Sequence, residues 1–449
     1  MKTAPMNLKN LLLGASLLFV LPLIPGLTFA EDKDTEAVMV AASLAETFPA
    51  WTVEPYIHWS GHVSLYSSKT RSYMMKKGLN FTETTPFAGV AGDKDRWAAI
   101  VEAKGFFSIP VLELPDGSFV SDTTGIIRFL EERHPEPRMQ PADPVMKALA
   151  WLIFSYGTEG LFLNAQHYRW DFEDSADFAA FDIGRALGDP ADKASIEKHG
   201  RAFQAMKQKR FPTEVGITDK TRPAIEKSNT LLFAKLDTYF RRYPYILGGR
   251  PSVADSALME PIHAHLSRDI HPSVIMKKTA PALNRWTETM NFGHYVPDAE
   301  LSQVPQEYLD ADNLPPELID FLKLVAADFG PLFEANAKAY EKWLAANPDV
   351  PEGTRVTNDQ ANMNRQAMGR AVYKLQGATV ERDAWPDTVN MHQYVLEVVD
   401  AMSDKDKARW TKLMKSIGGE VFLDHRPSRP VVLQADRKPF QIVVGPKAK

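Results

Sequence analysis

Short hydrophobic runs alternate with helical stretches near the start of the folded part of the chain. Aromatic and β-branched residues cluster at 55–59 and again at 81–85, which predicts two strands. Between them, residues 66–77 have helical composition and end at Gly78, the residue type that most often terminates a helix. Residues 97–103 are also helical in composition. The pattern predicts two successive strand–helix units.

Two further apolar runs, 108–114 and 118–120, flank a Pro-Asp-Gly turn at 115–117. Asp-Gly between such runs is the strongest short-range signal of a β-hairpin. A helix is then expected from Thr123, ending before His134. The complete order is β-α-β-α-β-β-α, which is the plan of a thioredoxin-like domain.

Helical periodicity dominates from Pro141 onward, and no strand is expected before the extreme C-terminus. The proline-rich, basic tail at 425–449 is expected to be irregular. Helices are expected at 144–166, 224–241 and 253–266 and around the apolar stripes at 318–329 and 410–417.

The sequence therefore predicts an α/β thioredoxin-like domain followed by an all-α domain. The predicted boundaries are a leader at 1–30, a connector at 31–54, the thioredoxin-like domain at 55–138, a helical domain at 139–300, and a helical C-terminal extension with an irregular tail at 301–449.

The first thirty residues have the organisation of a secretory signal. Lys2 and Lys9 precede an apolar stretch at 11–30, which ends in Thr-Phe-Ala with small residues at the cleavage positions. The expectation is a cleaved signal peptide and an exported protein, periplasmic or secreted. The alternative is an uncleaved membrane anchor at 10–30, since that segment approaches the length that spans a bilayer.

Composition narrows the classes of function. The net charge of −5 gives no electrostatic basis for a nucleic-acid partner. The chain has no cysteine, which excludes disulfides, thiolate metal sites and a cysteine nucleophile. His263 and His265 lie two apart on an expected helix and do not face one ligand together, so no metal site is expected.

Three segments of the sequence resemble those of glutathione transferases. The first is Ser-Leu-Tyr-Ser-Ser-Lys-Thr-Arg at 64–71, followed by Lys-Gly at 77–78. The second is Ile-Pro-Val-Leu at 109–112, with Asp-Thr at 122–123. The third, at 247–255, is similar to the Leu-Gly…Ser-x-Ala-Asp signature of the family's helical domain. The resemblance implies a glutathione-binding domain, glutathione as co-substrate, a hydrophobic electrophile as second substrate, and a homodimer.

The resemblance places Ser64 where the family has a catalytic serine or cysteine. Conjugation needs the glutathione thiol as thiolate, and its ordinary pKa of about 8.5 leaves little thiolate at neutral pH. A hydroxyl donor and a helix N-terminus both favour the anion. Tyr66 is the alternative donor, and Leu65, where many members have proline, leaves the register open by a residue or two. Ser64 also suits an ordinary N-cap.

Four residues are expected to bind glutathione. Pro110 resembles the family's cis-proline, which would leave the backbone of Ile109 able to pair with the cysteinyl unit of glutathione. The alternative is an ordinary strand-edge proline. Asp122 and Thr123 open a helix whose free N–H groups, together with the Thr123 hydroxyl, would hold the γ-glutamyl carboxylate, while Asp122 accepts from the ammonium group. From the sequence alone, these two residues are a helix cap.

His167, Tyr168 and Arg169 are candidates for the pocket of the second substrate, since in this fold their helix faces the cleft. The alternative is a surface histidine and arginine beside core aromatics. Ser252 and Asp255 have capping-box spacing and are expected to be structural.

These features predict an enzyme that activates the glutathione thiol for attack on an electrophilic small molecule, or a glutathione-dependent lyase, dehalogenase or isomerase. The alternative is a non-catalytic binding or scaffold protein that retains the fold.

Overall fold

The computed structural model describes residues 55–86, 94–105, 107–292, 300–359, 367–423, 425–434 and 441–447. All of them belong to one packed unit, Ala50–Lys449. The predicted leader and connector lie outside the described residues. No helix within these ranges combines the length and apolarity that crossing a bilayer requires.

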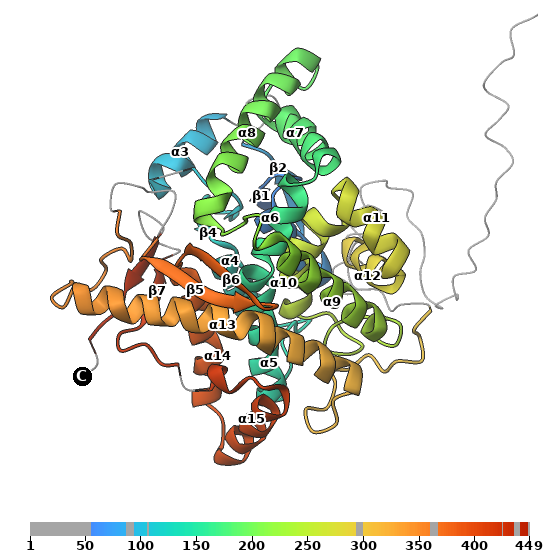
Figure 1. Ribbon diagram of the computed structural model, residues 1–449, viewed down its shortest axis with the longest axis vertical. Helices are drawn as coiled ribbons and strands as arrows, with labels where there is room; N and C mark the ends of the chain where they lie inside the picture. Colours follow the sequence, from blue (N-terminus) through green and yellow to red (C-terminus); the bar gives the residue numbers. More distant parts are fainter. Residues whose placement is uncertain are drawn as a thin grey trace, which may run out of the picture. The chain divides into compact units, whose positions relative to one another are not determined.

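The first domain is built on a mixed sheet (Figure 1). Its strands are β1 (Tyr56–Trp59), β2 (Phe81–Thr84), β3 (Val111–Glu113) and β4 (Phe119–Ser121). The spatial order is β2-β1-β3-β4, with β2 parallel to β1 and with β3 antiparallel to both β1 and β4. The predicted thioredoxin-like order of elements is confirmed.

The helices of this domain begin and end as their sequences indicate. They are α2 (Leu65–Lys77), α3 (Lys94–Lys104) and α4 (Thr123–Arg133). Gly78 ends α2 in the left-handed region, with φ of 70°, and its N–H bonds back to the last turn. Ile126, Ile127 and Leu130 form the buried face of α4.

The second domain is helical, as predicted. Its helices are α5 (Pro144–Ser155), α6 (Phe162–Trp170), α7 (Glu173–Leu187), α8 (Lys193–Glu214), α9 (Arg222–Phe240), α10 (Val253–Pro261), α11 (Ile270–Thr279) and α12 (Pro281–Asn291). A π-helical turn at Tyr156–Gly160 separates α5 from α6, where the sequence predicted one continuous helix. A second π-helical turn, Ile262–Ser267, follows α10.

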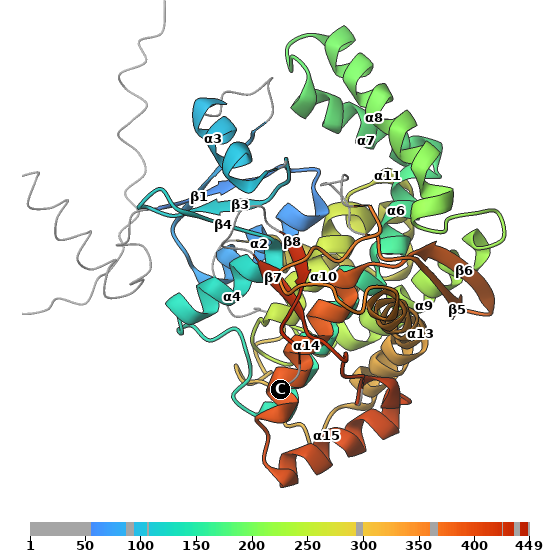
Figure 2. The ribbon, with the colours of Figure 1, turned by 90° about the vertical axis from the view of Figure 1, so that its left-hand side faces the viewer.

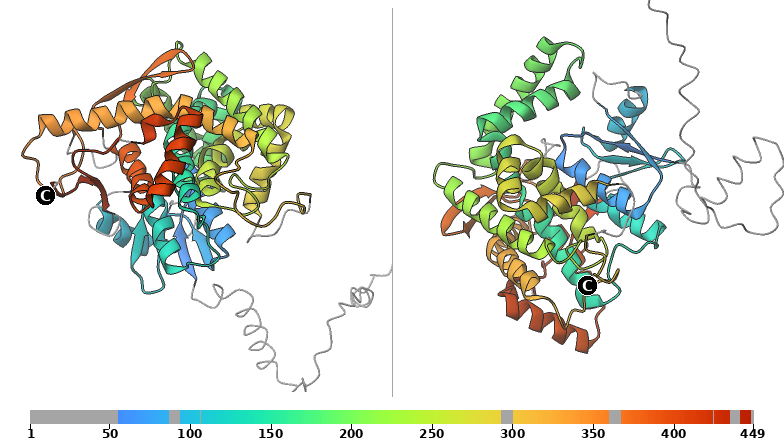
Figure 3. Two further views of the ribbon diagram at one scale, coloured as in Figure 1. Left: turned by 90° about the horizontal axis from the view of Figure 1, so that it is seen from below. Right: turned by 90° about the vertical axis from the view of Figure 1, so that its right-hand side faces the viewer.

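Helices α7 and α8 run side by side (Figures 2 and 3, green). Glycine permits their close approach: a Cβ at Gly184 would lie 2.0 Å from the carbonyl oxygen of Ile196, and one at Gly200 would lie 2.0 Å from that of Ala180.

The predicted capping box opens α10. The backbone N–H of Ser252 donates to Asp255 Oδ2 at 2.9 Å, while Ile246 N–H and Trp286 Nε1–H donate to Oδ1 at 2.8 and 3.2 Å. Burial raises the pKa of Asp255 to about 6, against these hydrogen bonds. The four residues tie the loop before α10 to α12, so the box is structural.

The C-terminal extension contains strands that the sequence analysis did not predict. Its elements are α13 (Pro316–Ala346), β5 (Arg370–Leu375), β6 (Ala378–Asp383), α14 (Pro386–Asp400), α15 (Asp404–Ile417), a 3-10 turn at Glu420–Phe422, β7 (Val431–Gln434) and β8 (Gln441–Val444). The expectations of an all-helical extension and an irregular tail are therefore wrong, because β5–β6 and β7–β8 are antiparallel hairpins.

The β5–β6 hairpin turns at Gln376 and Gly377, whose φ angles are 46° and 95°. Positive φ at both central residues is the turn geometry that matches strand twist. Strand β5 alternates exposed and buried residues, and its buried side packs on α13.

Candidate functional site

Three segments of the thioredoxin-like domain meet at one edge of its sheet. Trp59 of β1 pairs with Val111 of β3, and Val111 pairs with Ser121 of β4, so the three residues form one row across the sheet. From this row the chain leads into the loop before α2, the Pro110 segment and the start of α4. The predicted thiol-activating residue and the predicted glutathione-binding residues are therefore brought to the same edge.

Ser64 is the N-cap of α2 and is partly buried. Its Oγ accepts from the backbone N–H of Ser67 at 3.2 Å. A hydroxyl group has one proton to donate besides its acceptor lone pairs, so the capping role leaves that proton available. The first turn of α2 contains no acidic side chain, and the positive end of the helix dipole is not compensated there. This helix start favours an anion.

Tyr66 lies in the first turn of α2 and is 38% exposed. The alternative role as thiol donor remains a prediction for this residue.

The loop before Ser64 is supported by Glu83 at the end of β2. Ser60 Oγ–H donates to this carboxylate, and Arg71 Nε–H donates to it at 2.7 Å. Burial of Glu83 opposes ionisation, but the hydrogen bond and charge of Arg71 lower its pKa to about 2. The carboxylate therefore stays ionised and ties the loop to α2.

The Ile109–Pro110 peptide bond is cis, as predicted. Sheet pairing of β3 begins at Val111, so Ile109 lies just before the paired residues.

Lys104, at the end of α3, lies beside this segment and was not predicted as a site residue. Its Nζ donates to the carbonyl oxygen and the Oγ of Ser108, at 3.0 and 2.7 Å. Burial lowers the pKa of Lys104 to about 8, while the carboxylate of Asp122 opposes the decrease. No local sequence pattern marks this lysine, because its position depends on the packing of α3 against the sheet.

Asp122 is the N-cap of α4 and has a φ of 69°. Its Oδ1 accepts from the backbone N–H groups of Thr124 and Gly125, at 2.7 and 3.2 Å. Both hydrogen bonds go to Oδ1, so Oδ2 takes no part in capping the helix. Thr123 is buried at the first position of the helix. The capping role and the predicted binding role are thus chemically compatible.

The candidates for the second-substrate pocket are buried. His167 is 1% exposed and Arg169 is 3% exposed, so the interpretation of both as surface residues is wrong. Arg169 binds Asp269 through Nε at 2.7 Å and donates through Nη1 to the carbonyl oxygen of Val63 at 2.8 Å. It therefore links the loop before Ser64 to the segment before α11.

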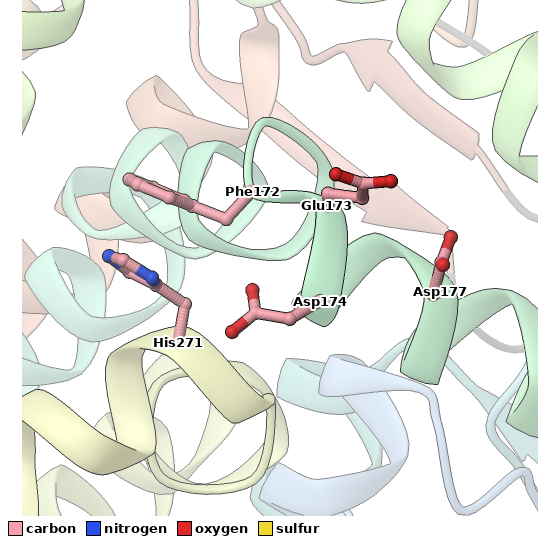
Figure 4. A pocket seen from close by; sticks show the side chains of 5 residues that line it. All are labelled: Phe172, Glu173, Asp174, Asp177 and His271. Atoms are coloured by element: carbon pink, nitrogen blue, oxygen red, sulfur yellow. The ribbon is translucent and has the colours of Figure 1, made fainter.

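A shallow cavity of about 510 Å³, open to solvent, lies between the start of α7 and α11. It is lined by Phe172, Glu173, Asp174, Asp177 and His271 (Figure 4). The ring of Phe172 stacks on His271 with centroids 3.7 Å apart, and the ring of Tyr168 stacks with both, at 5.3 Å from Phe172 and 6.3 Å from His271. Figure 4 shows the two lining rings on one side and the carboxylates of Glu173 and Asp177 on the other. The cavity wall thus begins three residues after the predicted trio.

No group of three or more histidine, aspartate or glutamate side chains arranged to hold a metal ion occurs within the part of the chain that the structure describes.

Two family models match the chain. Residues 63–133 match the glutathione S-transferase N-terminal domain, and residues 202–292 match the glutathione S-transferase C-terminal domain. The first match includes Ser64 and the Pro110 and Asp122 segments. A search of curated proteins gives no significant match.

Solved structures resemble the chain distantly. A glutathione S-transferase from Rhodospirillum rubrum is 13% identical, with a TM-score of 0.33, over 59% of this chain and 99% of its own. One from Methylobacterium radiotolerans, in complex with glutathione sulfonate, is 18% identical, with a TM-score of 0.29, over 58% of this chain and 98% of its own. A beta-etherase from Sphingobium is 18% identical, with a TM-score of 0.36, over 56% of this chain and 98% of its own.

Proposed function

The chain belongs to the glutathione transferase superfamily, and we propose that it binds glutathione at the edge of the thioredoxin-like sheet and activates its thiol. The observation that carries this proposal is the row Trp59–Val111–Ser121, which brings the Ser64 loop, the cis-proline and the start of α4 together. Superfamily membership supports glutathione-dependent activity in general, and the roles of individual residues are our proposal.

In this proposal the two ends of the site bind different parts of the tripeptide. The γ-glutamyl group lies at the start of α4, where the N–H of Thr123 and the helix dipole attract its carboxylate and Oδ2 of Asp122 accepts from its ammonium group. The backbone of Ile109 pairs with the cysteinyl unit. The thiol then lies at the start of α2.

Ser64 stabilises the thiolate by donating its hydroxyl proton to the sulfur. The uncompensated N-terminus of α2 adds to this effect, since a helix dipole favours negative charge. Together they lower the pKa of the thiol below its ordinary value of about 8.5, so more of it is ionised at neutral pH. The thiol proton passes to solvent, and the thiolate attacks the carbon of an aryl halide and displaces halide. The same thiolate would serve a lyase, dehalogenase or isomerase.

The second substrate binds in the cavity between α7 and α11. Its volume of about 510 Å³ has room for a small molecule, one side of which stays in contact with solvent because the cavity is open. The stacked rings of Phe172 and His271 offer an apolar surface, while the carboxylates opposite favour a polar or positively charged group on the same molecule. Arg169 connects this region to the loop that carries Ser64.

We also propose that the leader exports the protein and is cleaved after Ala30, and that the protein forms a homodimer. Sequencing of the mature N-terminus tests the first point: a start at Glu31 supports cleavage, and a start at Met1 supports the membrane anchor. Sedimentation analysis tests the second.

Calorimetric titration with reduced glutathione tests the binding, and turnover of an aryl halide tests the activation. We expect a Kd of about 1 mM or tighter and glutathione-dependent release of halide. Binding without turnover of several electrophiles would instead support the non-catalytic alternative. No binding at about 10 mM glutathione would contradict both.

A further inference from the structure

Helix α14 of the C-terminal extension packs on α5 (Figure 1), and its Tyr394 contacts Arg128 of α4. The ring of Tyr394 contacts both Trp151 of α5, at 5.7 Å between centroids, and the guanidinium of Arg128 of α4, at 4.1 Å from the ring centroid. Arg128 Nη1 also pairs with Glu397 Oε2 at 3.0 Å. Two residues one turn apart on α14 therefore hold one arginine of α4.

The same helix is joined to α2 through buried polar groups. Thr388 Oγ1–H donates to Glu159 Oε2 at 3.0 Å, in the π-helical turn between α5 and α6. The preceding residue, Thr158, accepts from Lys69 Nζ of α2 at 2.9 Å, and Lys69 pairs with Glu260 at 2.7 Å. These side chains are buried, so the connections are screened little by solvent. Helix α14 thus connects to both helices whose N-termini form the proposed glutathione site.

The β7–β8 hairpin is hydrogen-bonded to α14. Asn390 Nδ2 and Gln393 Nε2 donate to the carbonyl oxygen of Val431, at 2.9 and 2.6 Å, and the N–H of Val431 donates to Gln393 Oε1 at 2.7 Å. The hydroxyl of Tyr394 donates to Asn390 Oδ1 at 3.1 Å. The orientation of the Tyr394 side chain is therefore held by contacts other than the one with Arg128.

The backbone at the start of α4 depends on contacts with the surrounding structure. Asp122 has a φ of 69°, which is unfavourable for a residue with a side chain and persists only where the surroundings hold it. Burial raises the pKa of Tyr394, Arg128 opposes the rise, and the carboxylate of Asp122 adds to it. Tyr394 therefore lies within electrostatic reach of the residue proposed to bind the γ-glutamyl ammonium group.

We propose that α14 is a brace that positions the start of α4 for glutathione, with Tyr394 and Arg128 as its positioning residues. The inference rests on the proposed function, because it assigns the C-terminal extension a part in the same binding site. It gives a role to a segment that lies beyond both matched domains.

The test uses the full chain with Tyr394→Leu and Arg128→Met. A control on the same helix is Asp400→Asn, which removes the exposed ion pair between the last residue of α14 and Arg426 (2.8 Å) and contacts neither Tyr394 nor Arg128 in any hydrogen bond or ion pair of the described residues. We expect each brace variant to raise the glutathione Kd and KM about tenfold with kcat little changed, since small displacements of binding groups have effects of this size. The double variant should resemble the single variants, because the two residues act as one contact.

Hydrogen exchange provides a readout that does not depend on activity. The amides of Thr124 and Gly125, which bond to Asp122, should exchange faster in the brace variants and at the original rate in Asp400→Asn.

The outcomes separate this inference from the proposed function. If the unaltered protein does not bind glutathione, the proposed function fails and the brace fails with it. If it binds and the brace variants match the original protein, the brace alone is contradicted. Equal weakening in all variants, with equal losses of Tm, would show only general stabilisation by α14 and would also overturn the proposal.

Discussion

Two helix N-termini meet at the sheet edge that forms the proposed site, and they are capped differently. Helix α2 is capped by the neutral hydroxyl of Ser64, and helix α4 is capped by the carboxylate of Asp122. Neither helix has an acidic residue in its first turn. The α2 end therefore presents a dipole without a compensating charge, while the α4 end presents N–H groups beside an anion.

This difference suits the two ends of one tripeptide. A thiolate carries a negative charge and no positive one, so it is favoured where the capping side chain is neutral and can donate a hydrogen bond. A γ-glutamyl group is a zwitterion and needs an acceptor for its ammonium group as well as donors for its carboxylate. The two helix N-termini also have different neighbours. The loop before Ser64 is hydrogen-bonded to Glu83, which also binds Arg71, whereas Asp122 at the start of α4 lies near Lys104.

The largest expected effect is on thiol ionisation at the α2 end. Ser64→Ala should lower turnover about 100-fold at pH 6.5, because loss of the donor raises the pKa of the bound thiol toward about 8.5. The deficit should shrink above pH 9, where the thiol is ionised without help. A pH profile of kcat/KM for glutathione measures this.

Ser64→Thr is the matched control for that prediction, since it keeps a hydroxyl and should retain most of the turnover. A deficit of Ser64→Ala that stays constant with pH would contradict thiolate stabilisation. If Tyr66→Phe rather than Ser64→Ala produces the pH-dependent loss, the donor is Tyr66.

The next effect is on affinity at the α4 end. Asp122→Asn keeps an oxygen that can cap the helix and tolerates positive φ, but it lacks the charge that binds an ammonium group. We expect the glutathione Kd to rise about tenfold with unchanged stability. Asp122→Ala should lose the same affinity and in addition about 1 kcal/mol of unfolding free energy.

Titration with a glutathione analogue that lacks the γ-glutamyl ammonium group sharpens this prediction. Asp122→Asn should bind the analogue as well as the original protein does. An equal loss for both ligands would mean that Asp122 acts only by capping α4.

The sequence was sufficient for the parts of the site that depend on neighbouring residues. Ser64 and Asp122 each precede a helix and cap it, and Gly78 ends α2. Such signals act within one turn of a helix, so one sequence is enough to identify them. The cis bond at Pro110 was predicted from the family resemblance rather than from the local sequence.

The parts that depend on distant residues were missed. Lys104 comes near Asp122 only through packing of α3 on the sheet, and the cavity joins Phe172 to His271 across about a hundred residues of chain. The β5–β6 hairpin was missed because its turn is Gln-Gly, with Gln376 at a φ of 46°, rather than the Asn-Gly or Asp-Gly that marks such turns.

The smallest expected effect concerns the support of the α2 end. The pKa of Glu83 is about 2 in the folded protein and is ordinarily 4.5, so its ionised form stabilises the fold above about pH 4.5. That contribution is lost as the pH falls toward 2. Glu83→Gln should therefore lower the unfolding free energy by about 1 kcal/mol at pH 7, a value reduced by the partial exposure of the pair.

Urea unfolding at pH 7, 5 and 3.5 measures this effect, and the difference in unfolding free energy between Glu83→Gln and the original protein should shrink as the pH falls. The control Glu102→Gln, at an exposed position of the same domain, should show little difference at any pH. A difference that grows as the pH falls would mean that the ion pair with Arg71 does not support this end of the site.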